Sequence, residues 1–166
     1  MKKISWLLIC VMIILSMASV CFASGSADEG DFVMISQETI TDPDGYVIVN
    51  TLYEYIGSQT RGTKSGKAVQ DVYSNTNQLL YTVTAKGKFS YGTGYCNVTF
   101  QNGSFKPATG SLWRSTPSIT SGNVSSTKAY VNVSGTAKCL GFANRTYSLY
   151  LYCTSSGTLS SSFSGT

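Results

Sequence analysis

Apolar and polar residues alternate with a period of two along much of the chain, as they do in β-strands with one buried face. The clearest example is residues 79–91, where apolar residues take most of the odd positions and Thr, Lys and Ser most of the even ones. Residues 129–139 and 147–153 repeat the pattern. No window beyond residue 23 has helical periodicity. Short strands with frequent turns predict an all-β fold, either an antiparallel β-sandwich or a small barrel.

The longest predicted strand leads into a tight hairpin. The odd positions of residues 79–91 face inward, whereas in residues 95–100 the even positions do. Residues that oppose each other across an antiparallel pair share a face, so this change of parity requires a loop with an even number of residues. A two-residue loop at Thr93–Gly94 and a four-residue loop at 92–95 both satisfy this condition. The inward positions of the second strand are then Cys96, Val98 and Phe100.

A second hairpin is predicted around the sequence TDPDG at residues 41–45. Pro43 presets the backbone of a turn, Gly45 tolerates a positive φ, and β-forming residues flank both sides. A polar stretch rich in Gly and Ser follows this hairpin, and the end of the chain, rich in Ser and Gly, is expected to fray. The predicted regions are a signal peptide (1–23), an acidic N-terminal β-hairpin region (24–60), a linker (61–67), a basic β-sandwich domain (68–153) and a Ser/Gly-rich tail (154–166).

Residues 1–23 have the features of a secretory signal peptide, with two lysines, an apolar run and then small residues. We expect cleavage after Ala23; cleavage after Ala27 and a lipoprotein site at Cys21 are alternatives. The small residues at the cleavage-like site argue against a membrane anchor. The mature chain is therefore predicted to be secreted, extracellular or associated with the cell wall, without membrane attachment.

Charge is divided between two parts of the chain. Residues 28–60 contain seven carboxylates and no Lys or Arg, whereas residues 61–166 contain ten Lys or Arg and a single acidic residue, Asp71. Opposite charges attract, but salt screens exposed groups beyond about 8–10 Å. We therefore expect residues 31–55 to pack on the basic domain mainly through apolar side chains, adding strands to a sheet edge and shielding the basic residues.

Three cysteines lie beyond residue 23, and an exported protein meets oxidising conditions. If residues 129–139 and 147–153 form a hairpin, Cys139 lies at its closed end and Cys153 at its open end. About seven residues of strand then separate them by more than about 20 Å, far beyond the ~6 Å Cα–Cα reach of a disulfide. The sequence predicts a Cys96–Cys153 disulfide and a free thiol at Cys139.

Residues 63–160 resemble a group of small, secreted, all-β proteins of Gram-positive bacteria that have no assigned function. The resemblance rests on the stretches TKSGK (63–67), VYSNTNQLLYTVTAKGKFSYGTGYC (72–96), SGN (121–123) and YLYCTSSGTLS (150–160). The residues that match the patterns of the group are Phe89, Tyr91, Cys96, Leu151, Cys153, Gly157, Leu159 and Ser160. Cys139 is an addition to these patterns. The resemblance implies a secreted β-protein and supplies no activity.

Few of the residues on which enzymes and metal sites depend are present. The chain has no His, which removes the commonest general base and a usual zinc ligand. No carboxylate side chain follows Asp71, so a pair of acidic groups could come only from the acidic region. Asp42 and Asp44 are conceivable Ca²⁺ ligands, but a dedicated site needs more of them. We expect no metal and no organic cofactor.

One motif has the spacing of a nucleophile and its base. Ser125 and Lys128 match S-x-x-K, but that spacing works on a helix, whereas here it leads into a strand and the companion motifs are missing. Such a match is expected by chance in a chain rich in Ser and Thr. The sequence therefore predicts that the protein is not an enzyme.

Three tyrosines at polar strand positions are the main candidates for a binding surface. Exposed rings can stack on sugars or hold a protein partner, and nearby lysines would attract anions. The candidate surface consists of Trp113, Tyr130, Tyr150, Tyr152, Lys86 and Lys88. Alternatively, loops partly cover both sheet faces and the tyrosines are structural.

Together, these patterns favour a secreted, non-enzymatic binding module for an anionic cell-wall polymer, a carbohydrate or a protein, with no nucleic acid as partner. The alternative is an exported effector, a toxin or antimicrobial, in which the acidic N-terminal region is a removable cover.

Overall fold

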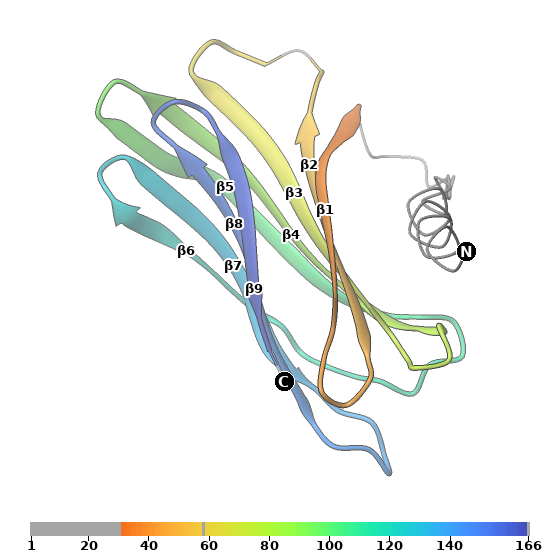
Figure 1. Cartoon of the computed structure of the whole chain (residues 1–166). Helices are drawn as coiled ribbons and strands as arrows, with labels where there is room; N and C mark the ends of the chain where they lie inside the picture. Colours follow the sequence, from red (N-terminus) through yellow and green to blue (C-terminus); the bar gives the residue numbers. More distant parts are fainter. Residues whose placement is uncertain (1–30, 58, 166) are drawn as a thin grey trace, which may run out of the picture.

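The computed structural model describes residues 31–57 and 59–165, which form two antiparallel β-sheets (Figure 1). The first sheet contains β1 (Phe32–Thr41), β2 (Val47–Tyr55), β3 (Thr63–Tyr73), β4 (Leu79–Gly92) and β5 (Tyr95–Pro107), in that order. The second contains β6 (Ser118–Ser125), β7 (Lys128–Ala137), β8 (Arg145–Thr154) and β9 (Leu159–Ser164), also in that order. The expected signal peptide, residues 1–23, lies outside the described residues.

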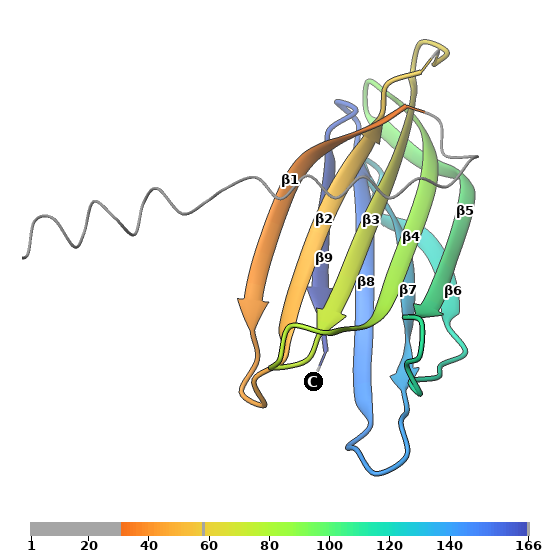
Figure 2. The same ribbon diagram turned by 90° about the vertical axis from the view of Figure 1, so that its right-hand side faces the viewer.

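Each strand pairs with its neighbour in the sequence, so both sheets are simple meanders. The sheets lie face to face with the apolar core between them (Figure 2). The prediction of an all-β fold is confirmed, and the described part of the chain contains no helix. Accordingly, none of these residues belongs to an apolar helix long enough to cross a membrane.

The alternation in the sequence places one side of each long strand in the core. In β4 the odd residues from Tyr81 to Phe89 are buried, whereas the even residues lie on the outer side of the sheet. The largest fully buried apolar side chains are Tyr81, Phe89, Leu149, Leu151, Val72, Val83, Val131 and Val133. Burying one such side chain contributes roughly 1.5–3 kcal/mol to folding. These inward positions therefore supply most of the apolar driving force.

A glycine in β5 allows the two sheets to approach each other closely. A Cβ atom added to Gly103 would lie 2.3 Å from the Cγ2 atom of Val133 on β7. That distance is far below van der Waals contact. Any larger residue at this position would force the sheets apart.

The hairpin between β4 and β5 has the two-residue loop Thr93–Gly94, the shorter of the two predicted loops. Gly94 has a φ of 78°, which glycine adopts without strain. The even number of loop residues that the parity argument requires is confirmed, and the structure decides between the two lengths.

A β-bulge in the same hairpin corrects the predicted orientation of Phe100. Phe89 pairs with Val98, but the adjacent Lys88 pairs with Phe100, so β5 contains one extra residue at this point. An extra residue reverses the alternation beyond it. Phe100 therefore lies on the outer side of the sheet and is 53% exposed, rather than facing the core.

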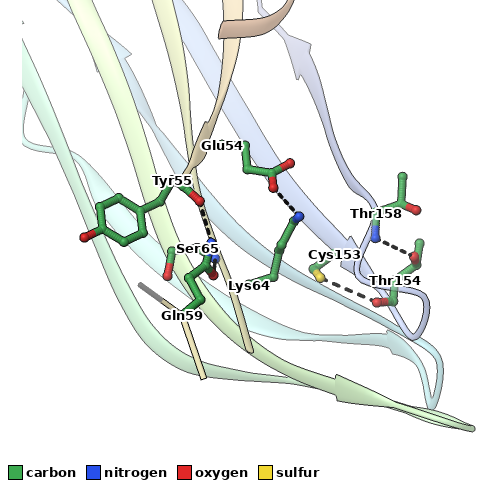
Figure 3. Close-up of polar contacts among 8 residues, drawn as sticks. All are labelled: Glu54, Tyr55, Gln59, Lys64, Ser65, Cys153, Thr154 and Thr158. Carbon is green, nitrogen blue, oxygen red and sulfur yellow. Dashed lines mark hydrogen bonds and ion pairs between the residues drawn. The ribbon is translucent and has the colours of Figure 1, made fainter. Parts of the chain in front are cut away.

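The segment expected to be a linker is largely part of a strand. β3 begins at Thr63, so most of residues 61–67 belongs to the first sheet. Gln59 fastens the preceding loop, because its side-chain amide donates to the backbone carbonyl of Tyr55 and accepts from the backbone N–H of Ser65 (Figure 3). The acidic hairpin and the part of the basic region up to the end of β5 thus belong to one continuous sheet.

The segment expected to be a frayed tail contains β9, which pairs with β8. Leu159 is 7% exposed, and Phe163 packs against the core. These two residues and Ser161 between them have the period of two that marks a strand. The high Ser and Gly content of residues 154–166 obscures this pattern in the sequence.

The acidic hairpin β1–β2 extends the first sheet, because β2 pairs with β3 from Val47 to Glu54. This agrees with the expectation that the hairpin adds strands to a sheet edge. Ile48 and Leu52 of β2 are part of the buried core. The hairpin is therefore integral to the fold.

An ion pair between the two sheets holds the tip of this hairpin. The Asp42 carboxylate accepts hydrogen bonds from the backbone N–H groups of Asp44 (3.0 Å) and Tyr46 (2.9 Å), which forms the predicted turn. The same carboxylate pairs with Arg145, the first residue of β8. The side chains of Asp42 and Arg145 are only 10% and 6% exposed. The Arg145 guanidinium also lies 4.1 Å from the centre of the Tyr46 ring.

Replacing Arg145 should destabilise the protein strongly. In Arg145→Met the Asp42 carboxylate stays buried without its partner, so we expect the free energy of unfolding to fall by about 3–5 kcal/mol. Urea denaturation followed by tyrosine and tryptophan fluorescence measures this change.

The matched control is Lys138→Met, which removes a cation from an exposed position. This variant should lose less than about 0.5 kcal/mol. Adding Asp42→Asn to Arg145→Met should recover part of the lost stability. If Arg145→Met unfolds at the same urea concentration as Lys138→Met, the ion pair does not hold the hairpin.

Candidate functional site

The alternation of β4 places lysines on the outer side of the first sheet. Its odd residues lie in the core, so Lys86 and Lys88 lie on the opposite side of the strand. The register sets Lys67 of β3 directly opposite Lys86, and Lys106 of β5 opposite Thr82 of β4. These four residues, Lys67, Lys86, Lys88 and Lys106, form what we call the lysine face.

The lysine face is long and narrow. Lys88 and Thr82, the partner of Lys106, lie roughly 20 Å apart along β4 at ~3.3 Å per residue. Lys88 and Lys106 are exposed, and Lys86 between them is half-buried. The row therefore presents positive charge along much of the length of the sheet.

Aromatic side chains accompany the lysines. The Lys67 ammonium lies 4.6 Å from the centre of the Tyr53 ring and 5.0 Å from that of Phe32, although Lys67 is only 8% exposed. These are favourable cation–π distances. Phe100 lies opposite Lys88 and is exposed. The face thus combines charge with apolar surface.

Among residues 31–57 and 59–165, the outer side of β3, β4 and β5 carries one carboxylate, Asp71. Its Oδ1 atom accepts a hydrogen bond from the Thr82 hydroxyl. Burial raises the pKa of Asp71 above its usual value, and this hydrogen bond opposes the rise. The outer side of these three strands is therefore predominantly cationic.

The three predicted tyrosines lie together on the outer side of the second sheet. The Tyr150 and Tyr152 rings are parallel within 5° with centres 5.5 Å apart, and the Tyr130 ring lies 5.8 and 6.5 Å from them. The Lys128 ammonium is 4.2 Å from the centre of the Tyr152 ring. Because these rings contact one another and Lys128, the protein itself uses part of their stacking surface. We call this group the tyrosine cluster.

The structure therefore divides the predicted binding surface among three places. Lys86 and Lys88 belong to the first sheet, and the tyrosine cluster lies on the far side of the sandwich. Trp113, in the connection between β5 and β6, is 4% exposed and its ring lies 5.6 Å from that of Tyr81 in the core. Trp113 is thus a core residue that cannot contact a ligand at the surface.

The motifs considered for chemistry have other structural partners. Asp42 and Asp44 both pair with Arg145 instead of converging on a cation site. Ser125 and Lys128 flank the turn between β6 and β7, where the Ser125 hydroxyl lies 3.2 Å from that of Thr127. Within the part of the chain that the structure describes, no three Cys, Asp or Glu side chains gather as a metal site.

Cys96 and Cys153 lie next to each other in the core. Both are fully buried, and burial together with the neighbouring Cys96 thiol raises the pKa of Cys153 to about 12. The Cys153 thiol also donates to its neighbour's backbone carbonyl, close to Lys64 (Figure 3). Cys139 is half-buried at the other end of the β7–β8 hairpin. All three are free thiols in the structure, so the Cys96–Cys153 disulfide stays a prediction.

Three residues on the outer side of the first sheet are absent from the surface predicted by sequence: Lys67, Lys106 and Phe100. Lys106 lies in the half of β5 that follows the bulge, and Phe100 lies at the bulge itself. One extra residue in β5 decides which side chains face outward, and the local sequence pattern carries no mark of it. Continued without the bulge, the alternation that places Cys96 and Val98 inward would also place Lys106 inward, so the sequence pattern gives no signal for this residue.

Comparison with known proteins assigns no family to the chain. No protein-family model matches it, and no curated protein or solved structure does so either. The resemblance to secreted proteins of Gram-positive bacteria rests on the sequence motifs alone. The function is therefore argued from the surfaces described above.

We expect the exported protein to form the Cys96–Cys153 disulfide by exchange with an oxidised dithiol, which takes up the two electrons and two protons. Closing this long loop stabilises the protein by about 4 kcal/mol if the effect is mainly on the unfolded chain. Peptide mapping without reduction should recover the linked peptides and an alkylated Cys139. A cross-link that contains Cys139 would overturn the pairing.

In the reduced protein, alkaline pH should lower stability through Cys153. Its pKa is raised from 9.0 to about 12 in the folded state, so the unfolded chain loses the proton first as the pH rises. The contribution of Cys153 to the free energy of unfolding should be constant below about pH 8.5, then fall by up to about 1.4 kcal/mol per pH unit until the folded thiol ionises. Cys153→Ala should decline less steeply above pH 9. Equal slopes for both proteins would contradict the assignment.

Proposed function

We propose that the protein is an exported, non-enzymatic binding module that holds an anionic polymer on the lysine face. The observation that carries this proposal is the row formed by Lys86, Lys88 and Lys106 along roughly 20 Å of one sheet. Alternate residues of a strand are ~6–7 Å apart. Lys86 and Lys88 are two residues apart on β4, and Lys106 lies roughly 13 Å further along the sheet, opposite Thr82. An extended polyanion that spans these positions would meet exposed ammonium groups, those of Lys88 and Lys106, at both ends of the row.

The surroundings of the lysines suit a chain-like ligand. Asn102 and Ser104 of β5 are exposed and lie opposite Lys86 and Thr84, so they can donate hydrogen bonds on the same face. Exposed Phe100 offers apolar surface for the backbone of a polymer. The row of lysines follows the direction of the strands, which favours an extended polymer over a compact ligand. Phosphate-containing wall polymers have the required chemistry.

The composition of the chain supports the other parts of the proposal. The absence of His and of any carboxylate beyond Asp71 favours a binding role over catalysis. The signal-peptide-like residues 1–23 favour export. An anionic cell-wall polymer would then be the partner that the mature protein meets first.

The alternative of an effector with a removable acidic cover fits the fold less well. Removing residues 24–60 would delete β1 and β2 and with them Ile48 and Leu52 of the core. We expect such a truncation to unfold the protein instead of exposing a basic surface. The acidic hairpin is better understood as two strands of the sheet.

Binding to linear polyphosphate and to heparin, measured by calorimetry at low and high salt, tests the proposal. Lys88→Gln/Lys106→Gln removes two exposed cations from the lysine face and should weaken binding roughly tenfold at low salt. Affinity of the unmodified protein should fall steeply with added salt, because exposed charges are screened.

The matched control is Lys128→Gln/Lys138→Gln, which removes the same charge from the second sheet and its adjoining loop. This double variant should retain binding within about twofold. Equal losses in the two double variants would mean that net charge alone attracts the polymer, and the lysine face would not be the site.

A further inference from the structure

The two sheets have different numbers of strands, and the difference leaves one side of β1 uncovered. β9 is an edge of the four-stranded sheet and packs against β2, whereas β1 lies beyond it (Figure 2). Val33 and Ile35 of β1 are each 48% exposed. The register places Val33 on the inner side of the sheet, opposite Glu54. The second sheet thus lacks a strand below β1.

A groove occupies this position, between β1–β2 and the open edge of β9. It consists of two adjoining cavities of about 450 Å³ and about 280 Å³. The residues that line both cavities are Ser36, Leu52 and Leu159. One end of the groove lies at the ion pair between Glu54 and Lys64 (Figure 3). Its floor combines apolar and polar side chains, as ligand-binding clefts do.

A buried amide side chain that lines the groove, Asn50, lacks hydrogen-bond partners, and the neighbouring Gln70 has one unpartnered atom. Asn50 lines the groove and is 5% exposed, yet neither its Nδ2 nor its Oδ1 atom has a hydrogen-bond partner among the described residues. Gln70, opposite Asn50 on β3, is 3% exposed, and its Oε1 atom has no partner there either. Buried polar atoms without partners are rare and destabilising. Their presence beside a groove points to a ligand that supplies the missing bonds.

The hydrogen-bonding groups of Asn50 and of the β9 edge indicate which kind of ligand the groove binds. A side-chain amide offers a donor and an acceptor, which match the C=O and N–H groups of a peptide unit. β9 pairs with β8 along one edge, and its other edge borders the groove. An open strand edge accepts a further strand through backbone hydrogen bonds. An extended peptide would therefore bond the Asn50 amide and, at the same time, pair with the open edge of β9.

The negative charge of Glu38 at the groove favours peptides that carry a Lys or Arg. Glu38 of β1 lies opposite Asn50, is exposed and lines the groove. Residues 28–60 contain no Lys or Arg, and the one lysine at the groove, Lys64, pairs with Glu54. Glu38 is thus available to a basic side chain of the ligand.

We propose that the groove binds an extended segment of a partner protein as a fifth strand of the second sheet. The segment has small apolar side chains that pack on Leu52 and Leu159 and a Lys or Arg that pairs with Glu38. Its backbone pairs with β9 and bonds the Asn50 amide. This site is separate from the lysine face, so it does not depend on the proposed polymer binding.

Other occupants fit less well. A second copy that paired its β9 with this one would carry its own β2 above that strand, and this β2 would collide with β1. Residues 24–30, which precede β1, have the sequence SGSADEG, with two carboxylates that Glu38 would repel and little apolar surface. A segment of another protein that alternates small apolar and polar residues and contains a Lys or Arg would not collide with β1, and Glu38 would attract it.

The probe is the capped hexapeptide acetyl-Val-Thr-Val-Thr-Lys-Thr-amide, which matches the length of β9 and presents Val, Val and Lys on one side. Titration into the ¹⁵N-labelled full chain, followed by NMR, should shift the amide signals of residues 35–38, 50–52 and 159–163. Hydrogen exchange at the β9 amides should slow when the peptide is bound.

Two N-methylated versions of the peptide test strand pairing directly. The N–H and C=O of one strand residue lie on the same edge and those of the next on the other edge. Methylating the amides of one alternate set should abolish binding, and methylating the other set should leave it within about threefold. If both versions bind as the unmodified peptide does, no strand is added to β9 and the proposal fails.

Side-chain variants of the protein test the floor of the groove. Asn50→Leu should weaken the peptide roughly tenfold, because two hydrogen bonds are lost. Its control, Asn102→Leu, changes an exposed asparagine on the lysine face and should have no effect. Glu38→Gln should weaken this peptide but not the version in which Thr replaces Lys.

Several results would overturn the proposal. Unchanged affinity in Asn50→Leu would show that the buried amide does not contact the ligand. Peptide-induced shifts on β4 and β5 would place the peptide on the lysine face. A protein that is dimeric without peptide, with β9 amides protected by the dimer, would show that a second copy fills the groove.

Discussion

The buried ion pair between Arg145 and Asp42 joins the two sheets, because it fixes the tip of the acidic hairpin against the first residue of β8. A buried charge that loses its partner is strongly destabilising, so β1 and β2 cannot leave the sheet without a large penalty. The acidic hairpin is thereby held in a fixed position relative to the basic residues that follow it in the chain. Carboxylates of the hairpin neutralise Arg145 and Lys64, whereas Lys88 and Lys106 lie on the outer side of the sheet.

The same arrangement creates two separate surfaces on one small fold. The outer side of the first sheet presents a row of lysines, which suits a long anionic ligand. The added strands β1 and β2 make the first sheet wider than the second, so a groove forms beneath β1. A protein with both surfaces could hold a wall polymer and, independently, a strand of a partner protein. Neither use requires a nucleophile, a metal or a general base.

Local alternation was enough to predict the β4 strand, an even number of residues in the β4–β5 loop and the β7–β8 hairpin, because in each the buried side repeats every second residue. It was insufficient where one residue changes the phase, as at the bulge that turns Phe100 outward. Sparse apolar residues among serines concealed β9, although Leu159 and Phe163 mark it. The burial of Trp113 and the Arg145–Asp42 pair depend on contacts between distant segments. Such contacts follow from how the sheets pack, which no short stretch of sequence specifies.

NMR mapping of a polyphosphate titration onto the backbone amides of the full chain shows directly whether the lysine face binds an anionic polymer. We expect salt-sensitive shifts concentrated in β4 and β5, near Lys86, Lys88 and Lys106, with the second sheet and the groove unchanged. Shifts centred on the tyrosine cluster, or spread evenly over all cationic residues, would contradict this expectation.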